Sequence, residues 1–133
     1  MTLEEINGEF NTVGLIAAMG MKAETWDPGA QALTLSMPYS ALVQGGAADG
    51  HFHGGAIGAL ADTAATYAVL AAGAENAPTA NYRADFLRPA TGPALRVVAT
   101  VRRLGRTIAM TDVDVFGLND KLVATLRLSS IVS

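Results

Sequence analysis

The sequence predicts an α+β domain in which one long buried helix packs against an antiparallel sheet. Residues 54–72 are almost all small and apolar, so a helix there would be buried on nearly every side. Beyond it, apolar and polar residues alternate over 95–102, 107–116 and 121–131, which is typical of strands with one buried face. The 133 residues are enough for one domain with a small core.

The elements before the long helix are expected to be one helix and two strands. Thr2 and Glu5 match a capping box, in which each side chain accepts from the other residue's backbone amide. Apolar residues then recur every three or four positions, which predicts an amphipathic helix over 3–18. Alternation over 33–37 indicates a strand, and the proline and glycines of 38–52 indicate a loop.

Four strands are expected after the long helix. An extended stretch over 78–87 precedes the three alternating segments, and Gly105 lies in a short turn between the first two of these segments. Consecutive strands joined by short turns pair side by side, so we expect a meander of about four strands. The sheet should then contain five or six antiparallel strands.

Charge and cysteine content exclude several classes of protein. The net charge of −3 is opposite to the positive surface that general nucleic-acid binding requires. The chain has no cysteine, so it has neither disulfides nor thiolate metal sites, which fits a reducing compartment. His51 and His53 lack a third ligand of suitable type and spacing, and we therefore expect no metal.

We expect a cytoplasmic protein without membrane contact. Residues 1–10 are acidic and lack an apolar core, unlike a signal peptide. The apolar run at 54–72 reaches the length of a membrane span. Its aspartate, two threonines and three glycines nevertheless fit the core helix of a globular protein better.

Asp62 is the residue at which function is expected. It is the single carboxylate of the apolar helix. Burial of an ionised carboxylate costs free energy, so such groups are usually paired with another group or take part in a reaction. Thr63, Thr66 and Tyr67 fall on the same arc of the helix, so we expect them to pack and hydrogen-bond around Asp62. The alternative is a purely structural carboxylate satisfied by such neighbours.

Three motifs resemble the PaaI-like acyl-CoA thioesterases, a family with the hotdog fold. They are H-G-G-A-I-G-A-L-A-D over 53–62, D-F-L-R-P over 85–89 and R-L-G-R-T over 103–107. The resemblance covers roughly residues 20–131. It implies a long central helix wrapped by the sheet, and hydrolysis of a medium-chain or aromatic acyl-CoA to the acid and free coenzyme A, without a cofactor.

Thioester hydrolysis passes through a tetrahedral oxyanion, which needs hydrogen-bond donors and a carboxylate acting on the carbonyl or on water. Gly54 and Gly55 suit the donor role, because a helix start has free amides and glycine lets a ligand approach the backbone. The resemblance assigns the carbonyl contact to Gly54 and makes Asp62 the nucleophile or general base. We expect His53 to orient the loop.

Other roles follow from the resemblance alone. It implies that Thr79 helps to position water, and that Asn81 and Phe86 lie near the pantetheine arm of the substrate. Relatives often carry an asparagine six residues before the histidine, where this chain has Ala47, and Gln44 could supply an amide instead. The coenzyme A contacts are expected in the turn with two guanidiniums, formed by Arg103, Gly105, Arg106 and Thr107.

The spacing of Gly54 and Asp62 predicts a site shared between two chains. Eight residues span about 12 Å along a helix, so one helix cannot easily present both groups to one carbonyl. Two antiparallel helices across a two-fold axis would bring one chain's Gly54 near its partner's Asp62. We therefore expect a homodimer whose monomer is inactive, and the resemblance implies a dimer of dimers.

Two other functions remain open at this point. Gly50, His51 and Phe52 resemble a motif of hotdog dehydratases that act on acyl thioesters, although position 65, where that group has its acid, is alanine. A protein that binds acyl-CoA without hydrolysing it is the non-enzymatic alternative, and Ala47 favours it. The sequence does not define the acyl group or the way in which dimers pair.

Overall fold

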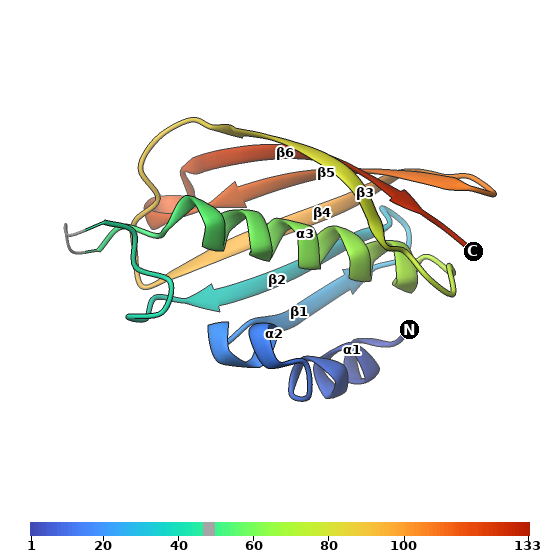
Figure 1. Ribbon diagram of the computed structural model, residues 1–133, viewed down its shortest axis with the longest axis horizontal. Helices are drawn as coiled ribbons and strands as arrows, with labels where there is room; N and C mark the ends of the chain where they lie inside the picture. The colour runs from blue at the N-terminus through green and yellow to red at the C-terminus, as the bar shows by residue number, and fades with distance from the viewer. Residues whose placement is uncertain (47–49) are drawn as a thin grey trace.

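The computed structural model describes residues 1–46 and 50–133 and shows one long helix lying across a six-stranded antiparallel sheet (Figure 1). The helices are α1 (Leu3–Phe10), α2 (Gly14–Met19) and α3 (Gly54–Ala71), with a 3-10 turn η1 (Leu118–Asp120). The strands are β1 (Lys22–Asp27), β2 (Ala32–Pro38), β3 (Thr79–Phe86), β4 (Ala94–Leu104), β5 (Ile108–Phe116) and β6 (Leu122–Ile131). The α+β prediction is confirmed.

The strand order is β1-β2-β4-β5-β6-β3, which differs from the expected meander at one place. Strands β4, β5 and β6 follow one another, but β3 pairs with β6 at the far edge instead of with β4. The reason lies in the connections: β2 pairs with β4, so that side of β4 is already occupied. Strand β3 is therefore an edge strand, and its outer edge has no partner within the described chain.

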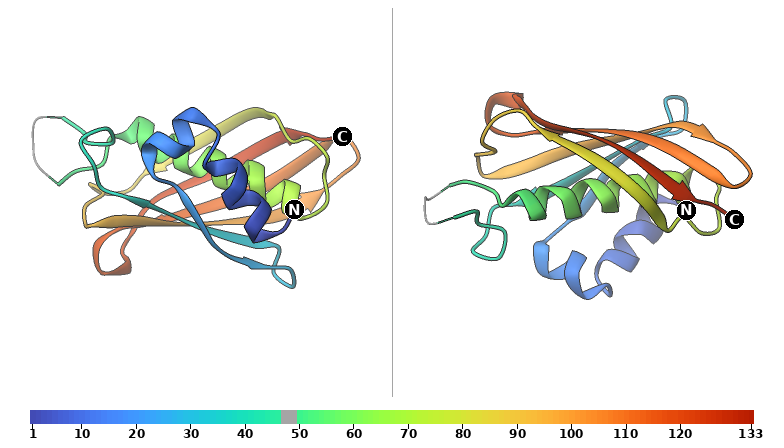
Figure 2. Two further views of the ribbon diagram at one scale, coloured as in Figure 1. Left: turned by 90° about the horizontal axis from the view of Figure 1, so that it is seen from below. Right: turned by 45° about the horizontal axis from the view of Figure 1, so that its top comes forward.

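The predicted N-terminal helix is divided into two. Thr2 and Glu5 form the expected capping box at the start of α1, but this helix ends at Phe10 and α2 begins at Gly14. The side chain of Asn7 donates to and accepts from the backbone of Ala23, and so fastens α1 to β1. Both helices lie on the α3 side of β1 (Figure 2).

Helix α3 supplies most of the interface with the sheet. Ten of its residues are buried, and α3 packs mainly on the inward side chains of β2, β4 and β5, such as Leu33, Val97 and Val113. The opposite side of α3 has a stripe of incompletely buried residues, Gly55, Ala59, Asp62, Thr63, Thr66 and Leu70. The buried helix therefore has one open face, and Asp62 lies on it.

Candidate active site

The Gly54 backbone amide at the start of α3 is available to a ligand. The His53 side chain is the N-cap, and its Nδ1 accepts from the Gly55 amide at 2.8 Å. Within the described residues no acceptor contacts the Gly54 amide. Both glycines were predicted to hold an oxyanion; in the structure the Gly55 amide donates to the cap, and the Gly54 amide has no acceptor among the described residues. The hydrogen bond from the Gly55 amide ties the His53 ring to the first turn of α3.

The loop before α3 holds Gln44 close to this helix start. Gln44 bridges to Phe52, and the backbone of Gly45 packs against that of His53. The Gln44 side chain donates to the Gly46 carbonyl at 3.4 Å, so its amide group is directed along the loop. Ala47, the position at which relatives carry asparagine, lies outside the described residues.

Strand β3 runs along α3 and contacts it at three successive turns. The Thr79 hydroxyl donates to Asp62 Oδ1 at 2.5 Å, the Phe86 ring lies beside Gly54, and the Tyr82 hydroxyl lies beside Gly58. Gly54, Gly58 and Asp62 recur every four residues and so form one row of the helix. The structure therefore brings Thr79 and Phe86, both predicted as site residues, to the two ends of this row.

Tyr82 and Gly58 were missed by the sequence reasoning. A Cβ on Gly58 would lie 3.0 Å from the Tyr82 hydroxyl, so the glycine makes room for the phenol. Tyr82 reaches this face because the β3–β6 register shifts between Thr79 and Asn81, which leaves Ala80 as the extra residue. The glycines at four-residue spacing before Asp62 were the available signal for a close approach on that row.

Two of the three neighbours expected around Asp62, Thr63 and Tyr67, form hydrogen bonds with other groups. The Thr63 hydroxyl donates to the Ala59 carbonyl of its own helix, and Tyr67 donates to Glu9 of α1 at 2.8 Å. That part of the expectation is wrong, because the Tyr67 side chain points to the α1 side of the helix. Burial raises the pKa of Tyr67 to about 12, and its hydrogen bond to Glu9 adds to the shift.

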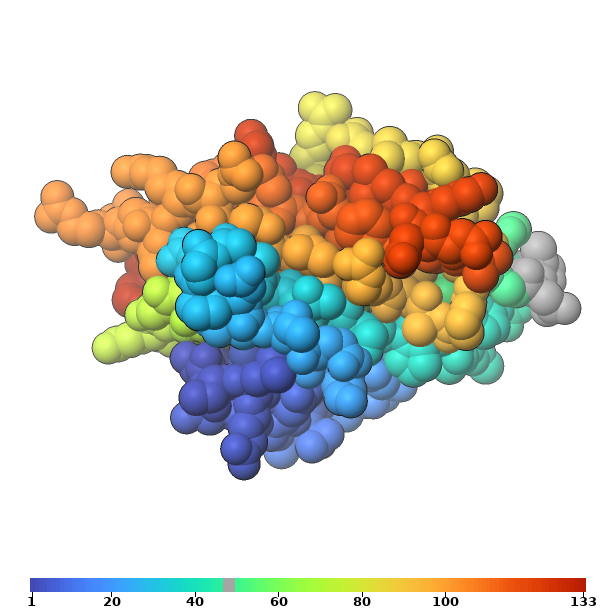
Figure 3. All heavy atoms as spheres, turned by 180° about the vertical axis from the view of Figure 1, so that it is seen from behind, coloured from blue at the N-terminus to red at the C-terminus, as the bar shows by residue number. Residues whose placement is uncertain are grey.

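The residues expected to contact coenzyme A are not gathered around Asp62 in one chain. Asn81 lies on the outer face of β3 and accepts from the Ser129 hydroxyl. The turn of residues 103–107, which includes Arg103 and Arg106, joins β4 to β5 at the end of the sheet remote from the start of α3 (Figures 1 and 2). It projects from the molecule in the space-filling view (Figure 3).

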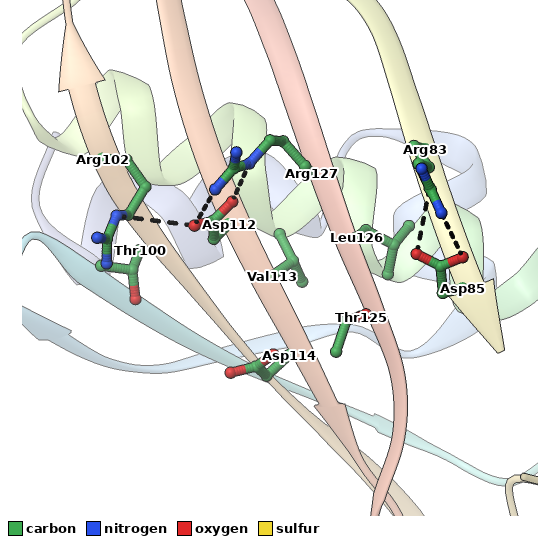
Figure 4. Close-up of a pocket in the computed structure, with 10 residues that line it drawn as sticks. All are labelled: Arg83, Asp85, Thr100, Arg102, Asp112, Val113, Asp114, Thr125, Leu126 and Arg127. Carbon is green, nitrogen blue, oxygen red and sulfur yellow. Dashed lines mark hydrogen bonds and ion pairs between the residues drawn. The ribbon is translucent and has the colours of Figure 1, made fainter. Parts of the chain in front are cut away.

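The outer face of the sheet carries a balanced set of charges. Arg127 and Arg102 pair with Asp112, and Arg83 pairs with Asp85, around a shallow hollow (Figure 4). The hydrogen bonds from Arg127 hold the pKa of Asp112 below its ordinary value. These exposed pairs contribute little individually, because solvent screens them. The sheet separates this face from Asp62.

Two kinds of site are not found in the described part of the chain. Residues 1–46 and 50–133 contain no group of three or more histidine, aspartate or glutamate side chains arranged to hold a metal ion. Among the same residues, no helix has the length and apolar character needed to cross a membrane.

Comparison with known proteins identifies similar chains over most of the length. The sequence profile of the thioesterase superfamily matches residues 49–124. Acyl-coenzyme A thioesterase PaaI of Escherichia coli (strain K12) is 32% identical over 113 residues, which are 83% of this chain and 76% of that protein. The crystal structure of the E. coli PaaI protein from the phenylacetic acid degradation operon has a TM-score of 0.82 and 26% identity, covering 99% of this chain and 96% of that one. A mutant of thioesterase PA1618 from Pseudomonas aeruginosa has a TM-score of 0.87 and 26% identity, covering 99% and 94%.

Proposed function

The chain belongs to the thioesterase superfamily and has its hotdog fold, and from that premise we propose that it hydrolyses a medium-chain or aromatic acyl-CoA. It is a thioester hydrolase of the PaaI-like kind. In the proposed reaction the oxygen of water joins the acyl carbon, and the carbon–sulfur bond breaks. The free acid leaves, and the sulfur leaves as the thiol of coenzyme A. No electrons are transferred, so the reaction requires no redox cofactor.

The observation that carries the proposal is the row formed by the Gly54 amide and the Asp62 carboxylate. A free amide at a helix start carries partial positive charge and can stabilise the oxyanion of the tetrahedral intermediate. The Thr79 hydroxyl holds Asp62 Oδ1 and leaves Oδ2 to take a proton from water or to attack the carbonyl. Gln44, next to the His53 backbone, would help to steer the water.

We assign the complete site to two chains. Gly54 and Asp62 are about 12 Å apart along α3, so they serve one thioester only if each comes from a different protomer. The open face of α3 and the unpaired edge of β3 are the surfaces available to a second copy. An antiparallel arrangement would also bring the turn of residues 103–107 of one chain toward the start of α3 in the other. The forked donors of Arg103 and Arg106 suit the phosphates of coenzyme A.

The test is hydrolysis of a panel of acyl-CoAs, with the released thiol measured by a thiol reagent. The wild-type protein should release thiol from medium-chain or aromatic substrates. Asp62→Asn should lower turnover by about two orders of magnitude or more, because the variant lacks a general base or nucleophile. Asp114→Asn is the matched control, since Asp114 is an exposed aspartate on the outer face of the sheet.

The same assay separates the alternatives. Loss or gain of unsaturation without thiol release would indicate a dehydratase, and saturable binding without turnover would indicate an acyl-CoA-binding protein. Equal turnover of Asp62→Asn and the wild type, with the fold intact by circular dichroism, would remove Asp62 from the mechanism.

A further inference from the structure

An apolar hollow opens beside the first two turns of α3, on the side away from β3. Leu15 and Met19 of α2 form one wall, Leu42 of the preceding loop forms another, and the floor is α3 itself at Gly55 and Ala56. Leu15 is 61% exposed and Leu42 is 60% exposed, whereas Met19 is buried. Figure 2 shows α2 lying near this end of α3.

The hollow is continuous with the proposed site. His53 and Gly55 line it, and Gly54, whose amide has no acceptor in the described part of the chain, lies between these two residues in the sequence. On the β3 side of Gly54 the Phe86 ring already occupies the space, 3.6 Å from where a Cβ would lie. A thioester whose carbonyl oxygen accepts from the Gly54 amide has two substituents, and the hollow is the open apolar space for one of them.

The chemistry of the lining indicates which substituent of the thioester carbonyl, the pantetheine arm or the acyl group, fits the hollow. The pantetheine arm carries amides and leads to charged phosphates, whereas the acyl group is apolar. Among the described residues, the lining contains no acidic, lysine or arginine side chain, and its one ionisable ring, His53, uses Nδ1 to accept from Gly55. An apolar acyl group gains free energy by leaving water here, and the polar arm would lose hydrogen bonds.

We propose that this hollow binds the acyl group of the substrate and that Leu15 and Leu42 set the length it accepts. The inference rests on the proposed thioesterase function. Small residues on α3 leave the floor flat, so the two leucines are the side chains that limit the depth of the hollow. Each further methylene that the hollow buries should raise kcat/KM about fourfold until the space is filled.

The experiment measures kcat/KM for straight-chain acyl-CoAs of increasing length with the wild type, Leu15→Trp and Leu42→Trp. Both leucines are more than half exposed, so a larger side chain should leave the fold intact, which circular dichroism checks. In the two variants, the ratio of kcat/KM on the longest substrate to kcat/KM on the shortest should fall about tenfold or more relative to the wild type. Leu118→Trp is the control, because Leu118 of η1 is 49% exposed and lies outside the hollow.

Three results would overturn the inference. If the wild type hydrolyses acyl-CoAs and both tryptophan variants keep its length profile, the acyl group binds elsewhere while the proposed function stands. If the variants instead change the molecular mass in light scattering and leave the profile intact, the hollow is a contact between copies. If the wild type hydrolyses none of the substrates, the proposed function fails. Equilibrium dialysis of the same acyl-CoAs then tests the hollow, and affinity independent of chain length would exclude it.

Discussion

At the scale of single residues, two adjacent backbone amides at the start of α3 differ in their hydrogen bonding. His53 caps the helix through the Gly55 amide, which fixes both the imidazole and the first turn. The Gly54 amide is left without an acceptor in the described chain, although it sits in the same positive end of the helix. The oxyanion role proposed for this helix start is therefore assigned to the Gly54 N–H group.

Replacing Gly54 with proline removes that N–H group with little other change. Gly54 is the first residue of α3, the position at which proline is best tolerated, and His53 before it has the extended backbone that proline requires. Gly54→Pro should lower kcat by about 10²-fold to 10³-fold, the usual effect of losing one oxyanion donor, with little change in the urea midpoint. Gly54→Ala keeps the amide, and its Cβ makes only an ordinary contact with Phe86. Similar kcat values for the two variants would contradict the role of the amide.

The residue types of the site could be predicted from the sequence, but their contacts could not. Asp62 and Gly54 were predicted from the apolar helix and Thr79 from the family resemblance, and the structure joins Thr79 to Asp62 directly. Tyr67 was expected beside Asp62 because helical spacing puts it on a neighbouring row. Its real partner, Glu9, is 58 residues away in the sequence, and no local pattern reports that contact.

At the scale of elements, the α3–β3 contact decides the shape of the site. Gly58 is the centre of the row between Gly54 and Asp62, and the Tyr82 hydroxyl occupies the space that a side chain on Gly58 would fill. Glycine within a helix costs about 1 kcal/mol relative to alanine. This loss of helix stability at Gly58 allows α3 and β3 to approach each other closely.

A double-mutant cycle tests this pairing. Gly58→Ala gains helix propensity, but its Cβ would lie 3.0 Å from the Tyr82 hydroxyl; in the Tyr82→Phe background the nearest ring atom is 3.8 Å away. Gly58→Ala should therefore stabilise the protein more in the Tyr82→Phe background than in the wild type, by about 0.5–1 kcal/mol of unfolding free energy in urea titrations. Equal effects in the two backgrounds would show that the phenol does not pack on Gly58.

The contact between α1 and α3 should be visible in the titration of tyrosine. Burial and the Glu9 hydrogen bond raise the pKa of Tyr67 from its ordinary value of 10.0 to about 12. The folded state thus holds the phenolic proton more tightly than the unfolded chain does. The resulting contribution to stability is complete below pH 10 and is lost as the pH rises toward 12.

Tyrosinate absorbance measured against pH should show a late phase near pH 12 that is absent from Tyr67→Phe. Glu9→Gln should move this phase to lower pH without abolishing the shift, because burial is its larger cause. A late phase that persists in Tyr67→Phe would assign it to another group.

The elements themselves were more predictable than their arrangement. Strands β2 to β6 and α3 agree with the predicted ranges within a few residues, because local periodicity specifies them. The place of β3 at the edge, its extra residue Ala80 and the break between α1 and α2 depend on contacts between distant segments. Such contacts leave no periodic signal in the chain.

At the scale of the whole molecule, the two sides of the sheet are suited to different surroundings. The outer face pairs its arginines with aspartates of the same chain, as around Asp112. Helix α3 covers the inner face, and the side of α3 away from the sheet carries the open stripe. Asp62 lies at the middle of this stripe, with small residues such as Ala59 around it. Small side chains allow two helices to approach closely, so this stripe suits the second copy that the proposed shared site requires.

Mixing two inactive variants tests whether the site is shared. If each site takes Gly54 from one chain and Asp62 from the other, a dimer of Gly54→Pro with Asp62→Asn has one intact site and one that carries both changes. Random exchange makes half of the dimers mixed, so an equimolar mixture should recover about a quarter of wild-type activity, while each variant alone stays inactive. A site contained within one chain would recover nothing, because every chain then carries a defect. Unfolding and refolding the mixed proteins together ensures exchange, and wild type treated in the same way supplies the reference rate.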